Sequence, residues 1–303
     1  MTVLVVGSVA LDSVETPFGK VENVLGGSAI YSSLAASLYT QVNLVGVVGG
    51  DFSKEHICML QDRGVDTRGL QVVEEGRTFR WSGRYDYDLN VTETIETQLN
   101  VFADFHPDLP RGFERSDLVF LANIDPDLQY EVLSQVKGAR LTMMDTMNYW
   151  IQGKRESLLR TIKAIDVLTI NEAEARMLAG TGSLLTAAKE ILRLGPKALI
   201  IKKGEYGAAI FADSFYFVAP AYPLEEVRDP TGAGDTFAGG FMGYLDRAGN
   251  TTNAAFNKAI VHGTILASFT VEDFSIERLR QVTMAQVESR YQEFKRFTHF
   301  EID

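Results

Sequence analysis

Short runs of apolar, largely β-branched residues recur along the chain and are mostly separated by segments long enough to form helices. The runs occupy residues 3–6, 42–48, 118–121, 141–144, 167–170 and 198–201. Near-continuous apolar strands that alternate with helices are typical of a parallel sheet with both faces covered. The pattern therefore predicts an α/β fold with a central, mostly parallel sheet and helices on both faces.

The segments between the runs carry the period expected of helices packed on such a sheet. Apolar residues recur at three or four positions apart in two stripes, Ile30, Leu34 and Leu38, and Leu158, Ile162 and Ile165. Side chains at this spacing share one helix face. We expect both stripes to lie in the core.

Residues 78–88 break this rhythm, because polar residues alternate strictly with Phe79, Trp81, Gly83, Tyr85 and Tyr87. Period-2 alternation indicates a strand or hairpin with one aromatic face. Residues 14–24 also resemble strand. We expect two insertions, about 14–24 and 78–101, to pair into a small lid sheet within a single domain spanning 1–303. Two alternatives stay open: a hairpin packed on the core, or an aromatic face that joins a homodimer.

Composition narrows the class of protein. The 303 residues include 40 acidic and 29 basic side chains, a net charge of 29 − 40 = −11, without a Lys/Arg-rich run. Duplex nucleic acids are bound by clustered cations, so they are disfavoured as partners. We expect no membrane partner and a cytoplasmic location, since neither a long apolar stretch nor a signal-like N-terminus is present. Cys58 is the single cysteine, which excludes an intrachain disulfide framework.

The segment most informative about chemistry is 229–240, Asp-Pro-Thr-Gly-Ala-Gly-Asp-Thr-Phe-Ala-Gly-Gly. Glycines on both sides of Ala233 allow a tight turn at a helix start, where free N–H groups converge on an anion. Asp235 beside such a site can accept a proton from a hydroxyl that attacks phosphorus. The alternative is that Asp235 is a simple helix N-cap.

Other catalytic and nucleotide-binding motifs are absent. The chain has no G-x-x-x-x-G-K-[ST], and Phe237 stands where a dinucleotide fingerprint requires its third glycine. Its four histidines form no H-E-x-x-H, and there is no G-x-S-x-G. These absences disfavour a P-loop ATPase, a nicotinamide oxidoreductase, a zinc enzyme and a serine hydrolase.

The segment 229–240 resembles the C-terminal signature of the PfkB, or ribokinase-like, carbohydrate and nucleoside kinases. Further segments resemble the same family in the family's order: Asp12, Gly26-Gly27, residues 45–51, 171–174 and 203–207. The resemblance spans nearly the whole chain. It implies a ribokinase-like fold, a small-molecule sugar or nucleoside as acceptor, and ATP and Mg²⁺ as cofactors.

The resemblance also implies roles for individual residues. Asp235 would be the catalytic base, and the backbone of Gly232, Ala233 and Gly234 would form an anion hole for the transferred phosphoryl group. The cofactor site would use Asn171 and Glu174, which organise Mg²⁺ partly through water, together with Lys202, Gly204 and Gly207 beside the nucleotide. The acceptor would contact Asp12, Gly26, Gly27 and Ser28. Asp229 and Thr231 match positions that bind a monovalent cation such as K⁺ in some members.

The chain departs from the family pattern at several positions. Tyr31 stands where members commonly have an asparagine that touches the acceptor. His262, with Gly263, aligns near the family's adenine site, although helix packing explains it equally well. Asn148, in a segment one residue longer than the family's D-P-N, and Asn123 follow strands, so we expect both in the acceptor pocket.

The function predicted from these features is ATP-dependent phosphorylation of a hydroxyl, expected to be primary, on a sugar or sugar acid. The alternative is a ribonucleoside such as adenosine, whose purine would stack on aromatic residues of the lid. We favour sugars because the family does so and because aromatic faces often mediate lid dimers. A non-catalytic regulator would be expected to lack Asp235, Asn171 or Glu174, which are all present.

Overall fold

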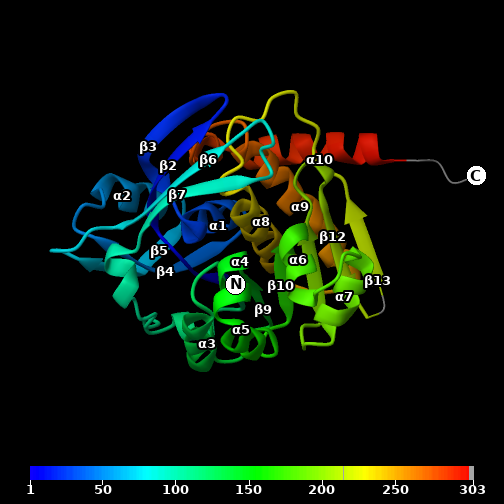
Figure 1. Cartoon of the computed structure of the whole chain (residues 1–303), viewed down its shortest axis with the longest axis horizontal. Coiled ribbons are helices and arrows are strands. Elements are labelled where there is room, and N and C mark those ends of the chain that lie inside the picture. Colours follow the sequence, from blue (N-terminus) through cyan, green and yellow to red (C-terminus); the bar gives the residue numbers. More distant parts are fainter. Residues whose placement is uncertain (214, 300–303) are drawn as a thin grey trace, which may run out of the picture.

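The apolar runs form a central sheet, as predicted (Figure 1). The computed structural model describes residues 1–213 and 215–299, and within them the sheet has nine strands in the order β13-β12-β11-β10-β9-β8-β1-β4-β5. The strands are β1 (Thr2–Val6), β4 (Gln41–Gly49), β5 (Val65–Val73), β8 (Leu118–Leu121), β9 (Leu141–Asp145), β10 (Val167–Asn171), β11 (Ala198–Lys202), β12 (Ala208–Ala212) and β13 (Phe215–Ala219). Pairing is parallel from β5 to β11 and antiparallel through β12 and β13.

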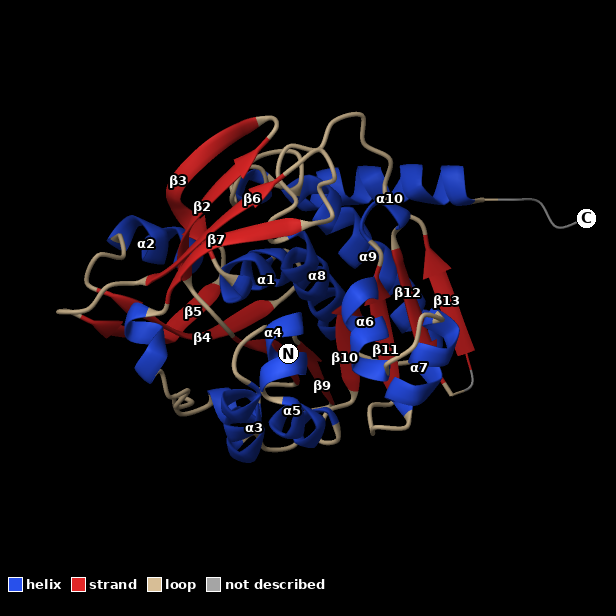
Figure 2. Cartoon of the chain, in the orientation of Figure 1, coloured by secondary structure: helices blue, strands red, loops and turns tan. Residues whose placement is uncertain are grey.

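Helices cover both faces of this sheet (Figure 2). They are α1 (Ser28–Ser37), α2 (Lys54–Asp62), α3 (Pro126–Gln135), α4 (Asn148–Gly153), α5 (Arg155–Ile162), α6 (Glu172–Ala179), α7 (Leu184–Leu192), α8 (Ala233–Ala248), α9 (Asn253–Thr270) and α10 (Met284–Thr298). Val3 and Val5 pack in one apolar cluster with α1, α8 and α9, whereas Leu4 and Val6 pack in another with α5, α6 and α7. Burial of both strand faces is the reason that the runs are apolar throughout. In the part of the chain described, no helix is long and apolar enough to cross a bilayer.

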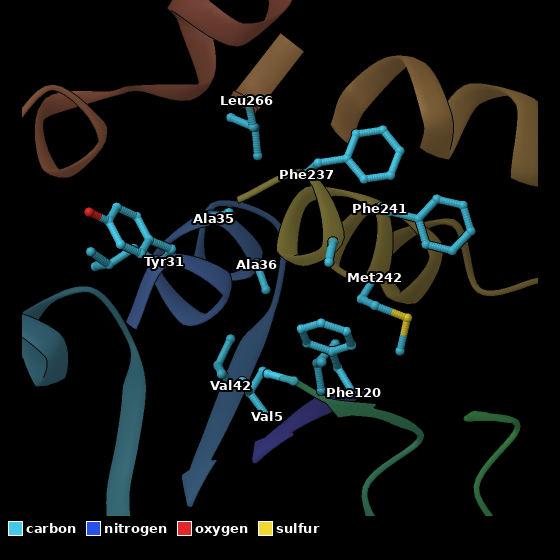
Figure 3. Close-up of a cluster of buried hydrophobic side chains, with 14 of the residues drawn as sticks. Val5, Tyr31, Ala35, Ala36, Val42, Phe120, Phe237, Phe241, Met242 and Leu266 are labelled. Carbon is cyan, nitrogen blue, oxygen red and sulfur yellow. The ribbon is translucent and has the colours of Figure 1, made fainter. Parts of the chain in front are cut away.

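Helices α1 and α8 lie side by side on the sheet. Figure 3 shows Tyr31, Ala35 and Ala36 of α1 next to Phe237, Phe241 and Met242 of α8, above Val5, Val42 and Phe120. A Cβ on Gly239 would lie 2.7 Å from the Ser32 Cα, and one on Gly243 would lie 2.8 Å from the Ala36 Cα. A step of four residues along α8 corresponds to a step of four residues along α1, so the two helices run parallel. Their N-termini meet at the carboxyl edge of the sheet.

The two predicted insertions form a second sheet of four strands among the residues described, in the order β3-β2-β6-β7. Its strands are β2 (Ala10–Thr16), β3 (Gly19–Gly26), β6 (Phe79–Tyr85) and β7 (Thr92–Gln98). The pairing of the two insertions was predicted, but the bounds of their strands were not. The first hairpin covers more than residues 14–24, and β6 ends before Tyr87, which is 88% exposed. The segment that follows β6 contains aspartates, so the alternation of polar and aromatic residues in the sequence extends beyond the end of the strand.

Candidate active site

Side chains able to carry chemistry gather at the carboxyl edge of the central sheet. Asp145 and Lys202 are the last residues of β9 and β11. Asp235 lies in the first turn of α8, and Asp12 comes from the lid strand β2. The carboxyl ends of parallel strands meet at one edge, where open α/β sheets bind their ligands. The fold therefore brings together residues that are far apart in the sequence.

The N-terminus of α8 is suited to an anion. Gly232, the N-cap, has a φ of 77° and provides no side-chain cap. A Cβ on it would lie 2.5 Å from ring carbons of Tyr31, so both the backbone angle and the close approach require glycine. No acceptor in the described part of the chain binds the Gly234 or Asp235 N–H. These donors and the helix dipole can face a phosphoryl group.

Asp235 is the third residue of this helix and not its N-cap, so the simple capping alternative is wrong. Burial raises the pKa of Asp235 to about 7, with a further increase from Asp145 and an opposing effect of Lys202. Its side chain keeps partial access to the site. A carboxyl with this pKa can accept a proton at neutral pH and release it again.

Lys202 lies within a group of carboxylates. Its Nζ is 2.6 Å from Oδ2 of Asp145, and the two side chains are 18% and 5% exposed. Burial alone would lower the pKa of Lys202, but Asp145, Glu174 and Asp235 together raise it. A Cβ on Gly234 would lie 3.1 Å from this Nζ. A protonated ammonium therefore lies next to the first turn of α8.

Asn171 and Glu174, the expected Mg²⁺ residues, are held together by a capping box at the start of α6. The Asn171 side chain accepts from the Glu174 N–H, and the Asn171 N–H donates to Oε2 of Glu174, both at 2.8 Å. Burial and Asp145 raise the pKa of Glu174 to about 7, whereas Lys202 lowers it. The second carboxylate oxygen is left for a cation or its water.

A closed metal cage is not formed: among the residues described, no group of three or more His, Cys, Asp or Glu could hold a metal ion. A site with a single carboxylate oxygen fits Mg²⁺, which keeps much of its hydration and takes further oxygens from phosphates. It does not fit a tightly held structural metal. The donor set thus agrees with a metal that arrives with a nucleotide.

Asp12 lies on the side of the site where the acceptor is expected. Burial raises its pKa to about 7; the Gly27 N–H lowers it, and the charges of Asp229 and Asp235 raise it. Gly26 lies directly under the Asp12 carboxylate. Gly27 is the N-cap of α1 with a φ of 95°, and a Cβ there would lie 2.5 Å from the Ser8 carbonyl oxygen. Gly26 thus lets the backbone approach the Asp12 carboxylate closely, whereas Gly27 lets it approach the backbone of Ser8.

The aromatic face of the lid points toward this acceptor side. Asp12 pairs with Trp81 in register between β2 and β6, so the two side chains lie on the same face of the lid. Tyr85 lies further along that face, and its hydroxyl is 3.2 Å from Oγ1 of Thr231, just before α8. The Tyr85 contact directs this part of the aromatic face toward the start of α8, and a role of the lid in joining two subunits stays untested. No sequence pattern predicted the Tyr85 contact.

Tyr31 lies between the two sides of the site. It is 2% exposed, its ring covers Gly232, and burial raises its pKa far above the ordinary value, with contributions from Asp12, Asp229 and Asp235. A phenol thus faces the carboxylates where family members commonly have an asparagine.

Three predicted pocket residues have other partners. The Ser28 hydroxyl is 3.1 Å from that of Ser8, which links the end of β1 to α1. Asn123 accepts from Nε1 of Trp150 at 3.1 Å, and Asn148 is exposed and accepts from the next N–H. Their contact with an acceptor stays a prediction.

His262 lies in the packing between helices, as the structural alternative predicted. Its ring stacks between Tyr244 and Tyr291, with centroids 4.2 Å and 4.9 Å away, and its Nδ1 is 3.0 Å from the Tyr39 hydroxyl. Burial lowers its pKa to about 4. A Cβ on Gly263 would lie 2.7 Å from the Phe237 carbonyl oxygen, so this glycine allows α9 to approach α8.

The remaining predicted residues lie in turns that border the site. Gly204 begins the 3₁₀ turn after β11 and faces the side chain of Asn90, at the β6–β7 turn of the lid. Gly207 ends that turn against the backbone of Ala219. Asp229 is 1% exposed and accepts from the Thr231 N–H at 2.9 Å, so it shapes the loop before α8. Cation binding by Asp229 and Thr231 stays a prediction.

Comparisons with known proteins find relatives along most of the chain. A sequence model described as "pfkB family carbohydrate kinase" matches residues 2–277. A cytidine kinase of Thermococcus kodakarensis is 32% identical over 252 residues, 82% of this chain and 89% of its own. A nucleoside kinase of Methanothermobacter thermautotrophicus is 26% identical over 294 residues, 93% of this chain and 87% of its own. The crystal structure of the Methanocaldococcus jannaschii nucleoside kinase superposes with a TM-score of 0.77 at 22% identity, covering 96% of this chain and 98% of that one.

Proposed function

Because the chain belongs to the pfkB family and is therefore a kinase with an alcohol acceptor, we propose that it phosphorylates a hydroxyl of a nucleoside with ATP. The observation that carries this mechanism is the position of Asp235, whose pKa is raised to about 7, in the first turn of α8 beside free backbone N–H groups. A proton acceptor and an anion site adjoin there. Both are required when a hydroxyl attacks phosphorus.

Asp235 takes the proton from the acceptor hydroxyl while the hydroxyl oxygen of the acceptor forms a bond to the γ-phosphorus of ATP. The bond from that phosphorus to the bridging oxygen breaks, and ADP leaves. Mg²⁺ neutralises phosphate charge when bound. Since phosphoryl transfer is largely dissociative, the Gly232–Gly234 backbone and Lys202 contribute mainly by positioning and by stabilising charge.

Nucleotide and metal would lie on the side of β10 and β11. Asn171 and Glu174 would hold Mg²⁺ through one carboxylate oxygen and water, Lys202 would face the phosphates, and Gly204 and Gly207 would leave room for the nucleotide. Asp229 and Thr231 would bind K⁺ through backbone oxygens. A dependence of turnover on K⁺, compared with tetramethylammonium at equal ionic strength, tests the last of these roles.

A nucleoside acceptor is favoured by two relatives, which are named cytidine kinase and nucleoside kinase. The lid supports the same choice, since Trp81 shares its face with Asp12 and offers an aromatic surface to a base. Asp12 would accept hydrogen bonds from ribose hydroxyls. A sugar or sugar acid is the second candidate, because the family is described as carbohydrate kinases and because Asp12 serves any vicinal diol.

The test is ADP release from Mg-ATP with cytidine, adenosine, inosine, ribose, fructose and 2-keto-3-deoxygluconate as acceptors. We expect turnover with at least one nucleoside. Asp235→Ala is expected to lower kcat by about 10²-fold to 10⁴-fold, the usual contribution of a general base, while ATP binds nearly as before. Turnover with sugars alone would exclude the nucleoside, and unchanged turnover in Asp235→Ala would exclude Asp235 as the base.

A further inference from the structure

A buried ammonium lies at a place in the fold that electrostatics alone disfavours. The N-terminus of a helix carries partial positive charge, which repels cations. Yet the Nζ of Lys202 is 3.1 Å from where a Cβ on Gly234 would lie, in the first turn of α8, and the lysine side chain is only 18% exposed. Another group must hold the ammonium there.

Asp145 is that group. Its Oδ2 lies 2.6 Å from the Nζ, while its Oδ1 accepts from the Thr146 N–H at 2.8 Å. Its carbonyl oxygen is bound at 2.9 Å by Nε2 of the buried Gln129. The carboxylate is therefore fixed at the end of β9 and is 5% exposed. It holds the ammonium at a defined point.

Among the residues described, the Asp145 carboxylate has no side-chain partner other than Lys202. Thr169 lies directly across from Asp145 in register on β10, but its buried hydroxyl has no hydrogen-bond partner within the described residues. Lys202 is the sole side chain in residues 1–213 and 215–299 that donates to the Asp145 carboxylate. Loss of that carboxylate therefore leaves Lys202 without its fixed partner.

The other nearby carboxylates have different partners or tasks. One oxygen of Glu174 is bound by the Asn171 N–H, and Asp235 has to remain available to a proton. An ammonium has three donors, of which Asp145 uses one. The other two can reach a phosphoryl oxygen bound at the Gly232–Gly234 backbone.

We propose that Asp145 is a positioning residue that fixes the Lys202 ammonium at the first turn of α8, so that Lys202 donates to the phosphoryl group during its transfer. This role rests on the kinase reaction proposed above. Asp145 itself touches neither substrate. It acts on the reaction through the place that it gives to Lys202.

The test compares the wild type, Asp145→Asn and Asp145→Asn/Lys202→Met with the best acceptor of the panel. We expect Asp145→Asn to lower kcat by about 10-fold to 100-fold, as loss of a group that orients a charged partner does. The KM for the acceptor should change by less than about 3-fold, and ATP should bind no more weakly, since a negative charge is removed. Adding Lys202→Met should lower kcat by less than about 3-fold more, because the two residues act as a unit.

A second readout needs no turnover. Mg-ATP and AMP are each titrated by calorimetry without acceptor. Compared with the wild type, Asp145→Asn/Lys202→Met should bind ATP about 10-fold or more weakly, the usual effect of losing a hydrogen bond from a charged donor, and should bind AMP equally well. Equal loss for ATP and AMP, or no loss, overturns the assignment of Lys202 to the transferred phosphate.

Controls distinguish a change in the position of Lys202 from a general loss of folding. The double variant removes both charges, so it leaves no unpaired buried ion, and thermal unfolding checks each protein. Lys197→Met removes a lysine paired at the same distance, 2.6 Å, at the opposite end of β11, and should leave kcat within about 2-fold. An unchanged kcat in Asp145→Asn, or a further 10-fold loss in the double variant, overturns the proposal. Absence of wild-type turnover with every nucleoside of the panel would contradict the proposed function, while the titrations would still decide where Lys202 lies.

Discussion

Two lysine–aspartate pairs lie at opposite edges of the central sheet. Lys197 and Asp166, just before β11 and β10, pair at 2.6 Å at the amino edge, and Lys202 pairs with Asp145 at the same 2.6 Å at the carboxyl edge. Their exposure differs: the lysine side chains are 82% and 18% exposed, respectively. The N–O distance is the same in the two pairs, but the burial of the lysine differs.

The difference in exposure fits a structural role for the pair at the amino edge and the proposed role in the reaction for the pair at the carboxyl edge. Asp166 also accepts from the N–H and hydroxyl of Thr142, so it joins two strand starts in the presence of water. A solvated pair of this kind contributes little to stability. The pair at the carboxyl edge has further carboxylates around it, and burial of charge costs free energy that an apolar pair would avoid. Its position beside α8 fits a role in catalysis better than one in stability.

The largest expected effect is on stability. Lys202→Met leaves Asp145 buried without its partner, and we expect the free energy of unfolding at pH 7 to fall by about 3 to 5 kcal/mol. Lys197→Met leaves Asp166 with Thr142 and water, so the expected change is about 0 to 1 kcal/mol. Urea unfolding of both variants measures the difference. Equal losses would mean that burial does not distinguish the two pairs.

A second contrast runs along α8, from its N-cap Gly232 to its C-cap Gly249. Both glycines have left-handed backbone, with φ of 77° and 69°, but only a Cβ on Gly232 would meet a neighbour, the Tyr31 ring at 2.5 Å. Gly232→Ala should therefore lower kcat by about 10-fold or more by displacing the donors that face the phosphoryl group.

Gly249→Ala is the matched control for this prediction. It introduces the same left-handed strain, about 1 to 2 kcal/mol, without a clash. We expect normal kcat and a modest loss in urea unfolding. Loss of activity in both variants would attribute the effect to backbone strain in α8 and not to the anion site.

A pH dependence follows from the raised pKa of Asp235. Since the base must be ionised, kcat/KM should rise with pH up to about 7 and then level off. Lys202 lowers this pKa, so Lys202→Met should move the inflection to higher pH, whereas Lys197→Met should not. Initial rates between pH 5 and 9 measure the shift. An inflection that stays in place would separate Lys202 from the base.

Buried carboxyls with raised pKa values also make stability depend on pH, and stability changes in the opposite direction to kcat/KM. Asp12, Glu174 and Asp235 each have a folded pKa of about 7, above the ordinary value for a carboxyl. Between about pH 4 and 7 the folded chain keeps protons that the unfolded chain has released, so the free energy of unfolding falls as pH rises through this window. Urea titrations at pH 5 and 7.5 measure the decrease. A higher stability at pH 7.5 would contradict the raised values.

Much of the site could be predicted from the sequence, but its connections could not. The motif around Asp235 was found as a local pattern, because a helix start needs a particular order of residues. The Asn171–Glu174 pair was singled out only through the resemblance to the family, since by itself it reads as a polar helix start. Asp145 was overlooked in favour of Asn148, although its place at the end of a buried apolar strand was a usable signal. For His262 the sequence left nucleotide contact and helix packing equally open, because alignment gives no information about which side of a helix faces the core.

By itself, the sequence determined the layered α/β fold, the existence of the lid insertions and the helix start that carries Asp235, because hydrophobic period and turn chemistry are local properties of the chain. Only the tertiary structure decided that Lys202 pairs with Asp145, that Tyr31 covers Gly232 and that the aromatic face of the lid lies on the side of Asp12. These contacts depend on strand order and helix packing between distant segments. No local pattern encodes them, since the same runs could pair in other orders with equal burial of apolar surface.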